Sequence, residues 1–277
     1  MLVSTEELAR HLADPNWVVI DARHDLAKPA EGREAWRAGH IPGAFHLHLD
    51  EDLAGPRTGR NGRHPLPDPH VFAQTLSGLG VTATSQVVAY DDTGNCFAVR
   101  VWWLLKWLGH DRVALLDGGL KAWLAEGRRI DAEAPAARTG RFTPRVQPGL
   151  TVDRQHVLAT RNDAHTCLID ARAPGRFHGE NETLDPVGGH IPGAANRFWQ
   201  MNLQPDGRFK SPEALRKQFL ELLNGVPPEN TIHSCGSGVT ACHNQFAMSL
   251  AGLAGSRVYP GSWSEWCAHP DLPVSTE

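Results

Sequence analysis

Two stretches of this chain, 39-GHIPGA-44 and 189-GHIPGA-194, are identical and lie 150 residues apart. The stretch 19-VIDAR-23 likewise recurs as 168-LIDAR-172. Motifs that repeat at nearly the same distance indicate one structural unit present twice. The order of the two motifs is also the same in each copy, so the repeat decides the fold: it predicts two domains of one type.

A third pair of motifs fixes the extent of the repeat. The stretch 116-LDGGLKAW-123 resembles 259-YPGSWSEW-266. Between the copies the chain is rich in Pro, Ala, Gly and Arg without a clear period, which is typical of a linker. We therefore predict an N-terminal domain over 1–132, a linker over 133–148 and a C-terminal domain over 149–277.

Short apolar segments alternate with helical patterns in both copies, which is typical of an α/β domain with a parallel sheet and helices on both faces. Ligands bind such sheets beyond the carboxyl ends of the strands. The expected strands are Trp17–Asp21, Gln86–Tyr90, Val113–Leu116, Cys167–Asp170, Thr231–Ser234 and Val258–Tyr259. The expected helices are Ser4–Asp14, Val71–Leu79, Ala98–Leu108, Gly119–Glu126, Ser211–Leu223, Val239–Leu250 and Ser262–Ala268.

Composition excludes several classes of protein. The chain has 277 residues, 41% of them hydrophobic, and a formal net charge of −4, which argues against a nucleic-acid partner. No apolar run approaches the ~20 residues of a membrane helix, and the first residues lack the features of a signal peptide, so we expect a cytoplasmic protein without a membrane partner. Five widely spaced cysteines fit a reducing compartment and leave thiols for chemistry.

One cysteine stands where a parallel sheet binds its ligands. In 231-TIHSCGSGVTACHNQ-245, Cys235 ends an expected strand and opens a glycine-rich turn into a helix. The N–H groups of such a turn can stabilise an anion, which makes a thiolate at this place a nucleophile. The alternative is a buried packing thiol, which is rarely followed by Gly-Ser-Gly.

The first copy has no thiol at the matching position. Asp91 stands there, in 88-VAYDDTGNC-96, so we expect the N-terminal domain to be catalytically inactive. The other four cysteines are interpreted as packing residues. They are Cys96, Cys167, Cys242 and Cys267.

The paired DAR and GHIPGA motifs, LDGGLKAW and the CGSGVT loop together resemble the tandem-domain rhodanese superfamily of sulfurtransferases over nearly the whole chain. The CGSGVT loop is similar to that of the 3-mercaptopyruvate sulfurtransferases, whereas thiosulfate sulfurtransferases more often carry C-R-K-G-V-T. The resemblance implies that Cys235 takes a sulfur atom as a persulfide and passes it to a small thiol, thioredoxin or cyanide. It implies no metal and no organic cofactor.

The resemblance also implies the remaining site residues. The loop N–H groups would hold the thiolate and then the persulfide, and Ser237, with His64 and Asp50 from the N-terminal half, would deliver a proton to the departing enolate. Asp52 is a neighbouring alternative to Asp50, and His64 could instead be an exposed loop histidine. The loop positions are Gly236, Gly238, Val239 and Thr240.

The segment 178–189 and the loop after Cys235 indicate different sulfur donors. Arg176 matches the family arginine that binds the donor carboxylate, although a solvent-facing role is the alternative. The second such arginine is missing from 178-HGENETLDPVGG-189, where Asp185 stands near its place, and Arg197 or another arginine could substitute. This segment looks more like that of thiosulfate-type enzymes. The loop after Cys235 is neutral and favours a carboxylate over the compact thiosulfate dianion.

Other residues recur in both copies and are therefore interpreted as structural: Arg23 and Arg172, His40 and His190.

Four further hypotheses are weighed beside sulfur transfer from 3-mercaptopyruvate to a thiol or cyanide. The first is thiosulfate:cyanide transfer. The second is a phosphatase, which the sequence disfavours because C-x5-R is absent: Ala241 is the sixth residue after Cys235. The third is a relay protein that carries a persulfide between partners. The fourth is a regulatory binding module, which fits the first domain, with Asp91, but not the second.

Overall fold

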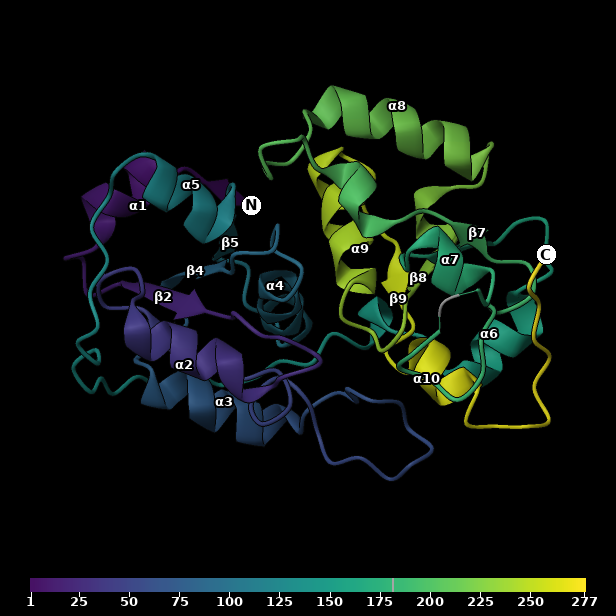
Figure 1. Ribbon diagram of the computed structural model, residues 1–277, viewed down its shortest axis with the longest axis horizontal. Coiled ribbons are helices and arrows are strands. Elements are labelled where there is room, and N and C mark those ends of the chain that lie inside the picture. The colour runs from purple at the N-terminus through teal and green to yellow at the C-terminus, as the bar shows by residue number, and fades with distance from the viewer. Residues whose placement is uncertain (181) are drawn as a thin grey trace. The chain divides into compact units, whose positions relative to one another are not determined.

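The computed structural model describes residues 1–180 and 182–277; Asn181, in the 178–189 segment, lies outside the described residues. The chain forms two compact units (Figure 1). The N-terminal unit consists of Met1–Gly55, Leu66–Gln147 and Gln204–Phe209. The C-terminal unit consists of Pro56–Pro65, Pro148–Leu203 and Lys210–Glu277. Each unit therefore contains one short segment from the other half of the sequence.

The N-terminal unit is built on a five-stranded parallel sheet with the order β1-β5-β4-β2-β3. In Figure 1, α1 and α5 lie on one side of this sheet and α2 and α3 on the other. The strands are β1 (Leu2–Val3), β2 (Trp17–Asp21), β3 (Phe45–His46), β4 (Gln86–Tyr90) and β5 (Val113–Leu116). The helices are α1 (Thr5–His11), α2 (Ala30–Ala38), α3 (Pro69–Gly78), α4 (Ala98–Trp107) and α5 (Gly119–Ala125).

The C-terminal unit repeats this topology. Its parallel sheet has the order β7-β6-β8-β9, and a parallel bridge from Thr151 to Val258 stands where β1 pairs with β5 in the other unit. The strands are β6 (Cys167–Asp170), β7 (Ala195–Asn196), β8 (Thr231–Ser234) and β9 (Arg257–Val258). The helices are α6 (Arg154–Thr160), α7 (Pro174–Phe177), α8 (Pro212–Leu223), α9 (Ala241–Leu250) and α10 (Ser262–Trp266), with 3₁₀ turns at Pro148–Leu150, Trp199–Asn202 and Pro228–Asn230.

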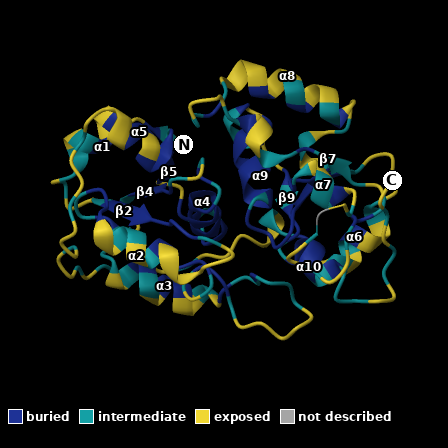
Figure 2. Ribbon diagram, viewed as in Figure 1, coloured by how far each residue is buried: buried dark blue, intermediate teal, exposed yellow. Residues whose placement is uncertain are grey.

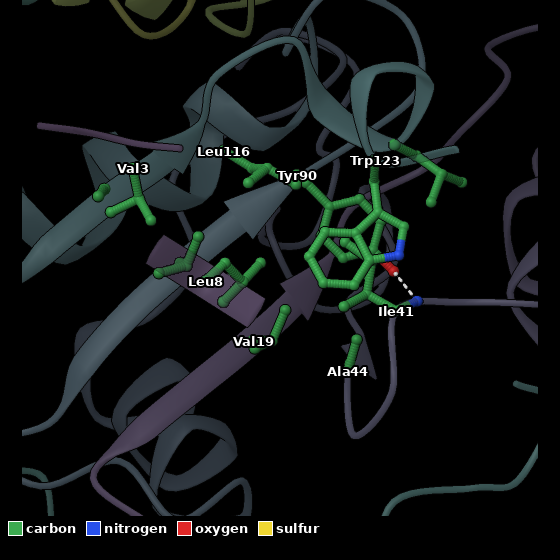
Figure 3. Packing of buried hydrophobic residues seen from close by; sticks show 11 residues of the cluster. Val3, Leu8, Val19, Ile41, Ala44, Tyr90, Leu116 and Trp123 are labelled. Carbon is green, nitrogen blue, oxygen red and sulfur yellow. Dashed lines mark hydrogen bonds between the residues drawn. The ribbon is translucent and has the colours of Figure 1, made fainter. Parts of the chain in front are cut away.

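Each sheet has a hydrophobic core on the face that carries the last helix of its unit. In the N-terminal unit, Leu8 of α1 and Trp123 of α5 pack with strand residues such as Val19 (Figure 3). The Tyr90 hydroxyl accepts a hydrogen bond of 3.1 Å from the Ile41 N–H. The helix that directly follows β4 or β8, which is α4 or α9, is buried along almost its whole length (Figure 2). Such burial is typical of a helix that packs against the protein on more than one face.

The repeated motifs hold each unit together in the same way. Arg23 forms an ion pair of 2.7 Å with Asp21 and donates a hydrogen bond of 2.7 Å to the Gly39 carbonyl. Arg172 makes the same pair with Asp170, also at 2.7 Å, and donates to the Gly189 carbonyl at 2.7 Å. The arginine of DAR thus ties its strand to the start of GHIPGA, which confirms its structural role.

The histidines of GHIPGA are also structural, as predicted. His40 contacts the Trp36 carbonyl through Nδ1 at 2.7 Å, and His190 contacts the Phe177 carbonyl through Nδ1 at 2.9 Å.

The sequence predicted the central elements better than the edges. All six expected strands are present, although the last is Arg257–Val258, and Ser4 and Ser211 cap α1 and α8 through hydrogen bonds from the Glu7 and Ala214 N–H groups. Short elements such as α2, α6 and α7 were not predicted, and the expected helix from Val239 begins only at Ala241 because the turn occupies the residues before it. No helix within the described ranges is long and apolar enough to cross a membrane.

Candidate functional site

The turn after β8 places Cys235 at the carboxyl end of a central parallel strand, as predicted. Two backbone hydrogen bonds from the start of α10 hold this turn in place. The Cys235 carbonyl accepts a hydrogen bond of 3.0 Å from the Trp263 N–H, and the Gly236 carbonyl accepts one of 2.9 Å from the Ser264 N–H. With its carbonyls held by α10, the turn directs its own N–H groups toward the side chain of Cys235.

The sulfur of Cys235 lies within this turn. Its Sγ accepts hydrogen bonds from the Ser237 N–H at 3.4 Å and from the Gly238 N–H at 3.1 Å, and the residue is 2% exposed. Gly238 has φ +78°, and a Cβ there would lie 2.2 Å from the Pro260 carbonyl oxygen, so only glycine fits. Two N–H groups therefore point at the sulfur, where a thiolate or persulfide would carry its charge.

The last two loop residues connect the turn to α9. Val239 is buried, and its carbonyl accepts the Cys242 N–H at 3.1 Å. Thr240 is the N-cap residue of α9 and accepts the His243 N–H at 3.1 Å. Both carbonyls therefore point along the helix, away from the sulfur. That the N–H groups of Gly236, Val239 and Thr240 also hold the sulfur stays a prediction.

His64 meets Ser237, as the resemblance implied. The His64 Nδ1 and the Ser237 Oγ are 2.7 Å apart, and both residues are buried. His64 comes from the segment Pro56–Pro65, which belongs to the C-terminal unit although it lies in the first half of the sequence. The Arg63 N–H donates to the Ser264 Oγ at 3.0 Å, and this bond attaches the segment beside the active turn.

Asp50 lies in the N-terminal unit, so its pairing with His64 stays a prediction. Its carboxylate is 3.8 Å from the Nε2 of His24, and its N–H donates to the Nδ1 of His48 at 3.2 Å. His48 also contacts the Pro29 carbonyl through Nε2 at 2.9 Å. These three side chains have the composition of a metal site, but both ring nitrogens of His48 already have partners. The alternative, Asp52, accepts the His48 N–H at 2.7 Å.

Arg176 lies beside the active turn and is paired with two acids. Its Nε and Nη2 each donate to Glu182 at 2.9 Å, and Nη2 also contacts Asp185 at 3.1 Å. A Cβ built on Gly236 would lie 3.4 Å from both Nη1 and Nη2 of Arg176. The guanidinium is therefore held in place by carboxylates next to the residue that follows Cys235, which is where a donor-binding arginine would be needed.

Arg197 does not replace the missing second arginine of the family. Its Nη2 donates to Asn202 at 3.0 Å and to Gln218 at 3.1 Å, and its guanidinium stacks over the Phe219 ring at 4.1 Å. Burial lowers the pKa of Arg197 to about 10. Arg197 is thus a buried structural residue, and the suggestion that it substitutes for the second arginine was wrong.

Arg63 was not among the site residues predicted from the sequence. Its guanidinium pairs with Asp185, and its Nη2 would lie 2.9 Å from a Cβ on Gly236. Burial raises the pKa of Asp185, with Arg63 and Arg176 opposing this shift. The sequence offers one indication that Arg63 lies in the site, which is that it directly precedes His64. No local pattern connects Arg63 to Asp185.

Arg172 completes the positive charge around the sulfur. Burial by itself would lower its pKa, but Asp170, Glu182 and Cys235 outweigh that effect and raise it. Arg172 is also stacked over the Trp263 ring at 4.9 Å. It is therefore a fixed cation within electrostatic range of Cys235.

Three of the other cysteines are unsuited to the same role. All five are free thiols. Burial raises the pKa of Cys167 and of Cys267 to about 11, so both remain protonated at neutral pH. Cys242 is buried in α9, where its Sγ donates to the Gly238 carbonyl at 3.3 Å.

Known proteins resemble this chain over nearly its whole length. Residues 4–126 and 153–269 both match the family model of the rhodanese-like domain. A protein of Pseudomonas aeruginosa named "Probable 3-mercaptopyruvate sulfurtransferase" is 47% identical, over 99% of this chain and 98% of its own length. The thiosulfate sulfurtransferase of Cricetulus griseus is 34% identical, over 99% and 95%.

A solved structure leads to the same family. The 3-mercaptopyruvate sulfotransferase SseA of Escherichia coli superposes with a TM-score of 0.82 at 30% identity, covering 95% of this chain and 98% of that one. Two matches to one domain model, with two parallel sheets of the same topology, agree with the internal repeat. The chain belongs to the rhodanese-like family, with two such domains in tandem.

Proposed function

We propose that the protein is a sulfurtransferase that moves sulfur from 3-mercaptopyruvate to a thiol or cyanide through a persulfide on Cys235. The Cys235 thiolate attacks the donor sulfur, the S–S bond forms, and the C–S bond breaks with its electrons going to the carbon fragment. That fragment is pyruvate enolate, which takes up a proton and leaves as pyruvate. An acceptor thiolate or cyanide then attacks the outer sulfur and restores the Cys235 thiolate.

The contact between Ser237 and His64 is the observation that carries this proposal. The enolate needs a proton, and thiosulfate cleavage, which releases sulfite, has no such need. A serine hydroxyl two residues after Cys235, 2.7 Å from a buried histidine, is suited to deliver that proton. Asp50, or Asp52, would orient the imidazole of His64. The N-terminal domain, with Asp91 in place of the cysteine, would support this reaction without carrying sulfur itself.

The charges beside the loop support a donor with one negative charge. Arg63 and Arg176 are balanced by Glu182 and Asp185, and Gly236 and Ser237 are neutral. A carboxylate can bind guanidinium groups that are already partly neutralised, whereas a compact dianion gains most from unpaired cations. The relative from Pseudomonas aeruginosa carries the corresponding name.

Thiosulfate is the second candidate donor, because the 178–189 segment lacks the second arginine and relatives named thiosulfate sulfurtransferase are also similar. The test is kcat/KM for both donors with one acceptor. We expect a large preference for 3-mercaptopyruvate. A preference for thiosulfate would overturn the choice of donor and remove the reason for a proton relay. Absence of turnover with both donors, combined with sulfur transfer from a partner protein, would favour a persulfide relay.

A further inference from the structure

Two guanidinium groups from distant parts of the sequence flank the residue after the active cysteine. A Cβ on Gly236 would lie 2.9 Å from Nη2 of Arg63 and 3.4 Å from Nη1 of Arg176. Both side chains belong to the C-terminal unit, and each is about one-fifth exposed. They are therefore partly accessible to a small solute.

Arg63 is held in position from both ends. Its main-chain N–H donates to the Ser264 Oγ, and the N–H of the same serine donates to the Gly236 carbonyl. At the other end, its Nη1 donates to Asp185, whose second oxygen accepts from Arg176. One serine and one carboxylate thus fix the Arg63 guanidinium relative to the turn that carries Cys235. This arrangement reduces the entropy that ordering a long side chain would otherwise cost on binding.

The two guanidinium groups keep donors on the side that faces the turn. Arg176 uses Nε and Nη2 for Glu182 and Asp185, and Arg63 uses Nη1 for Asp185 and the Leu184 carbonyl. Nη2 of Arg63 and Nη1 of Arg176 make no hydrogen bond to any residue that the structure describes, and these are the nitrogens next to Gly236. Asp185 already shows that one carboxylate can bridge the two arginines.

We propose that Arg63, together with Arg176, binds the carboxylate of the sulfur donor, with Asp185 as the counter-ion that holds both arginines ready. The inference rests on the proposed function and names a specificity residue for it. The ligand class is a small monocarboxylate whose reactive atom lies within a few bonds of the carboxyl group, as in an α-keto acid with a β-thiol. Glu182 and Asp185 disfavour a second negative charge at the same place.

The first test compares variants in steady-state assays with 3-mercaptopyruvate. We expect Arg63→Ala to raise KM about 10-fold, the usual scale for one charge-assisted contact, with a smaller fall in kcat. Arg63→Lys keeps the positive charge but lacks the planar guanidinium with its paired donors, so its KM should lie between those of the wild type and Arg63→Ala. Arg60→Ala is the matched control, because Arg60 is an exposed arginine of the same segment. An unchanged KM in Arg63→Ala, or an equal rise in Arg60→Ala, overturns the proposal.

A second test does not depend on turnover. Cys235 is alkylated with iodoacetate, a small monocarboxylate, and with the neutral iodoacetamide, and the Cys235 peptide is followed by mass spectrometry. We expect the ratio of the alkylation rate with iodoacetate to that with iodoacetamide to fall about 10-fold in Arg63→Ala and to stay constant in Arg60→Ala. Each ratio compares two reagents on one protein, so a general change in folding or in thiol reactivity cancels.

The two tests separate two kinds of failure. If the wild-type chain does not use 3-mercaptopyruvate but the alkylation ratio falls in Arg63→Ala, the proposed function is wrong and the carboxylate site remains. If the wild-type chain uses 3-mercaptopyruvate and neither KM nor the ratio responds to Arg63, the proposed function remains and the role of Arg63 is wrong.

Discussion

The turns at Asp91 and Cys235 occupy the same place in the two domains and are filled differently. Both follow a central strand, and both carbonyls accept an N–H from the helix after the next strand, Leu120 at 2.8 Å and Trp263 at 3.0 Å. The Asp91 carboxylate lies inside its own turn and accepts four backbone hydrogen bonds, which come from the N–H groups of Thr93, Asn95, Phe97 and Ala98 at 2.8–3.0 Å. In the C-terminal turn a sulfur accepts two.

The difference shows what this turn is suited to hold. In the N-terminal domain the buried Asp91 carboxyl group occupies the turn; burial raises its pKa, and the backbone hydrogen bonds from the turn oppose this shift. In the C-terminal domain the hydrogen bonds to the Cys235 sulfur are fewer and longer, at 3.4 and 3.1 Å. Both turns thus direct backbone N–H groups at their own side chain, a carboxylate in one domain and the Cys235 sulfur in the other.

The largest effect should come from removing the sulfur. Cys235→Ser should abolish transfer from both donors, because a serine hydroxyl cannot form a persulfide. The measurement is sulfur transfer together with the mass of the Cys235 peptide, which should gain one sulfur atom only in the wild type. Cys167→Ser is the control and should retain activity. Residual turnover by Cys235→Ser would remove Cys235 from its assigned role.

Removing the carboxylate from the other turn should affect stability instead. Asp91→Ala leaves four N–H groups, three of them buried, without their acceptor, which should lower the free energy of unfolding by about 4 kcal/mol in urea denaturation. Asp91→Asn retains one oxygen acceptor and should lose about half as much. If both variants unfold like the wild type, the turn does not depend on an anion and the comparison fails.

The proton relay predicts a loss that depends on the donor. His64→Ala should reduce kcat with 3-mercaptopyruvate about 100-fold, a usual scale for general acid–base catalysis, and affect thiosulfate turnover far less. Ser237→Ala should give the same pattern, since the two side chains are in contact. His70→Ala, on an exposed position of α3, serves as the control. Equal losses with both donors would contradict the relay.

The position of His64 also marks the limit of what the sequence could predict. Both sheets could be predicted from the repeated motifs and the apolar runs, because the periodicity of a strand or a helix is visible in a short stretch of sequence. The turn at Cys235 was predicted from the Cys-Gly-Ser-Gly pattern. The docking of the segment 56–65 onto the C-terminal unit depends on contacts with Ser264 and His269, about 200 residues away, and no local pattern encodes them. Arg63 was missed for this reason, although its neighbour His64 was found.

The smallest predicted effect concerns the strand that leads to each turn. His233 stands in β8 opposite Ile169, where the other domain has Ala89 opposite Ile20. Burial lowers the pKa of His233 to about 3, below the value of about 6.5 expected in the unfolded chain. The unfolded chain therefore binds a proton that the folded protein does not, and stability falls as the pH drops below about 6.5 toward 3.

Substitution by the residue of the other domain should remove this dependence. His233→Ala should be less stable at pH 8 because it leaves a cavity, but its free energy of unfolding should decline less steeply between pH 6 and 4, by up to about 1.4 kcal/mol per pH unit. Urea denaturation across this range measures the slope, with His165→Ala, an exposed histidine, as the control. Parallel slopes in the wild type and His233→Ala would mean that His233 is protonated in the fold. The strand β8, which leads to Cys235, would then carry a positive charge at His233, whereas β4 has the neutral Ala89 at the matching position. The two turns would therefore differ in electrostatics as well as in the side chain that occupies them.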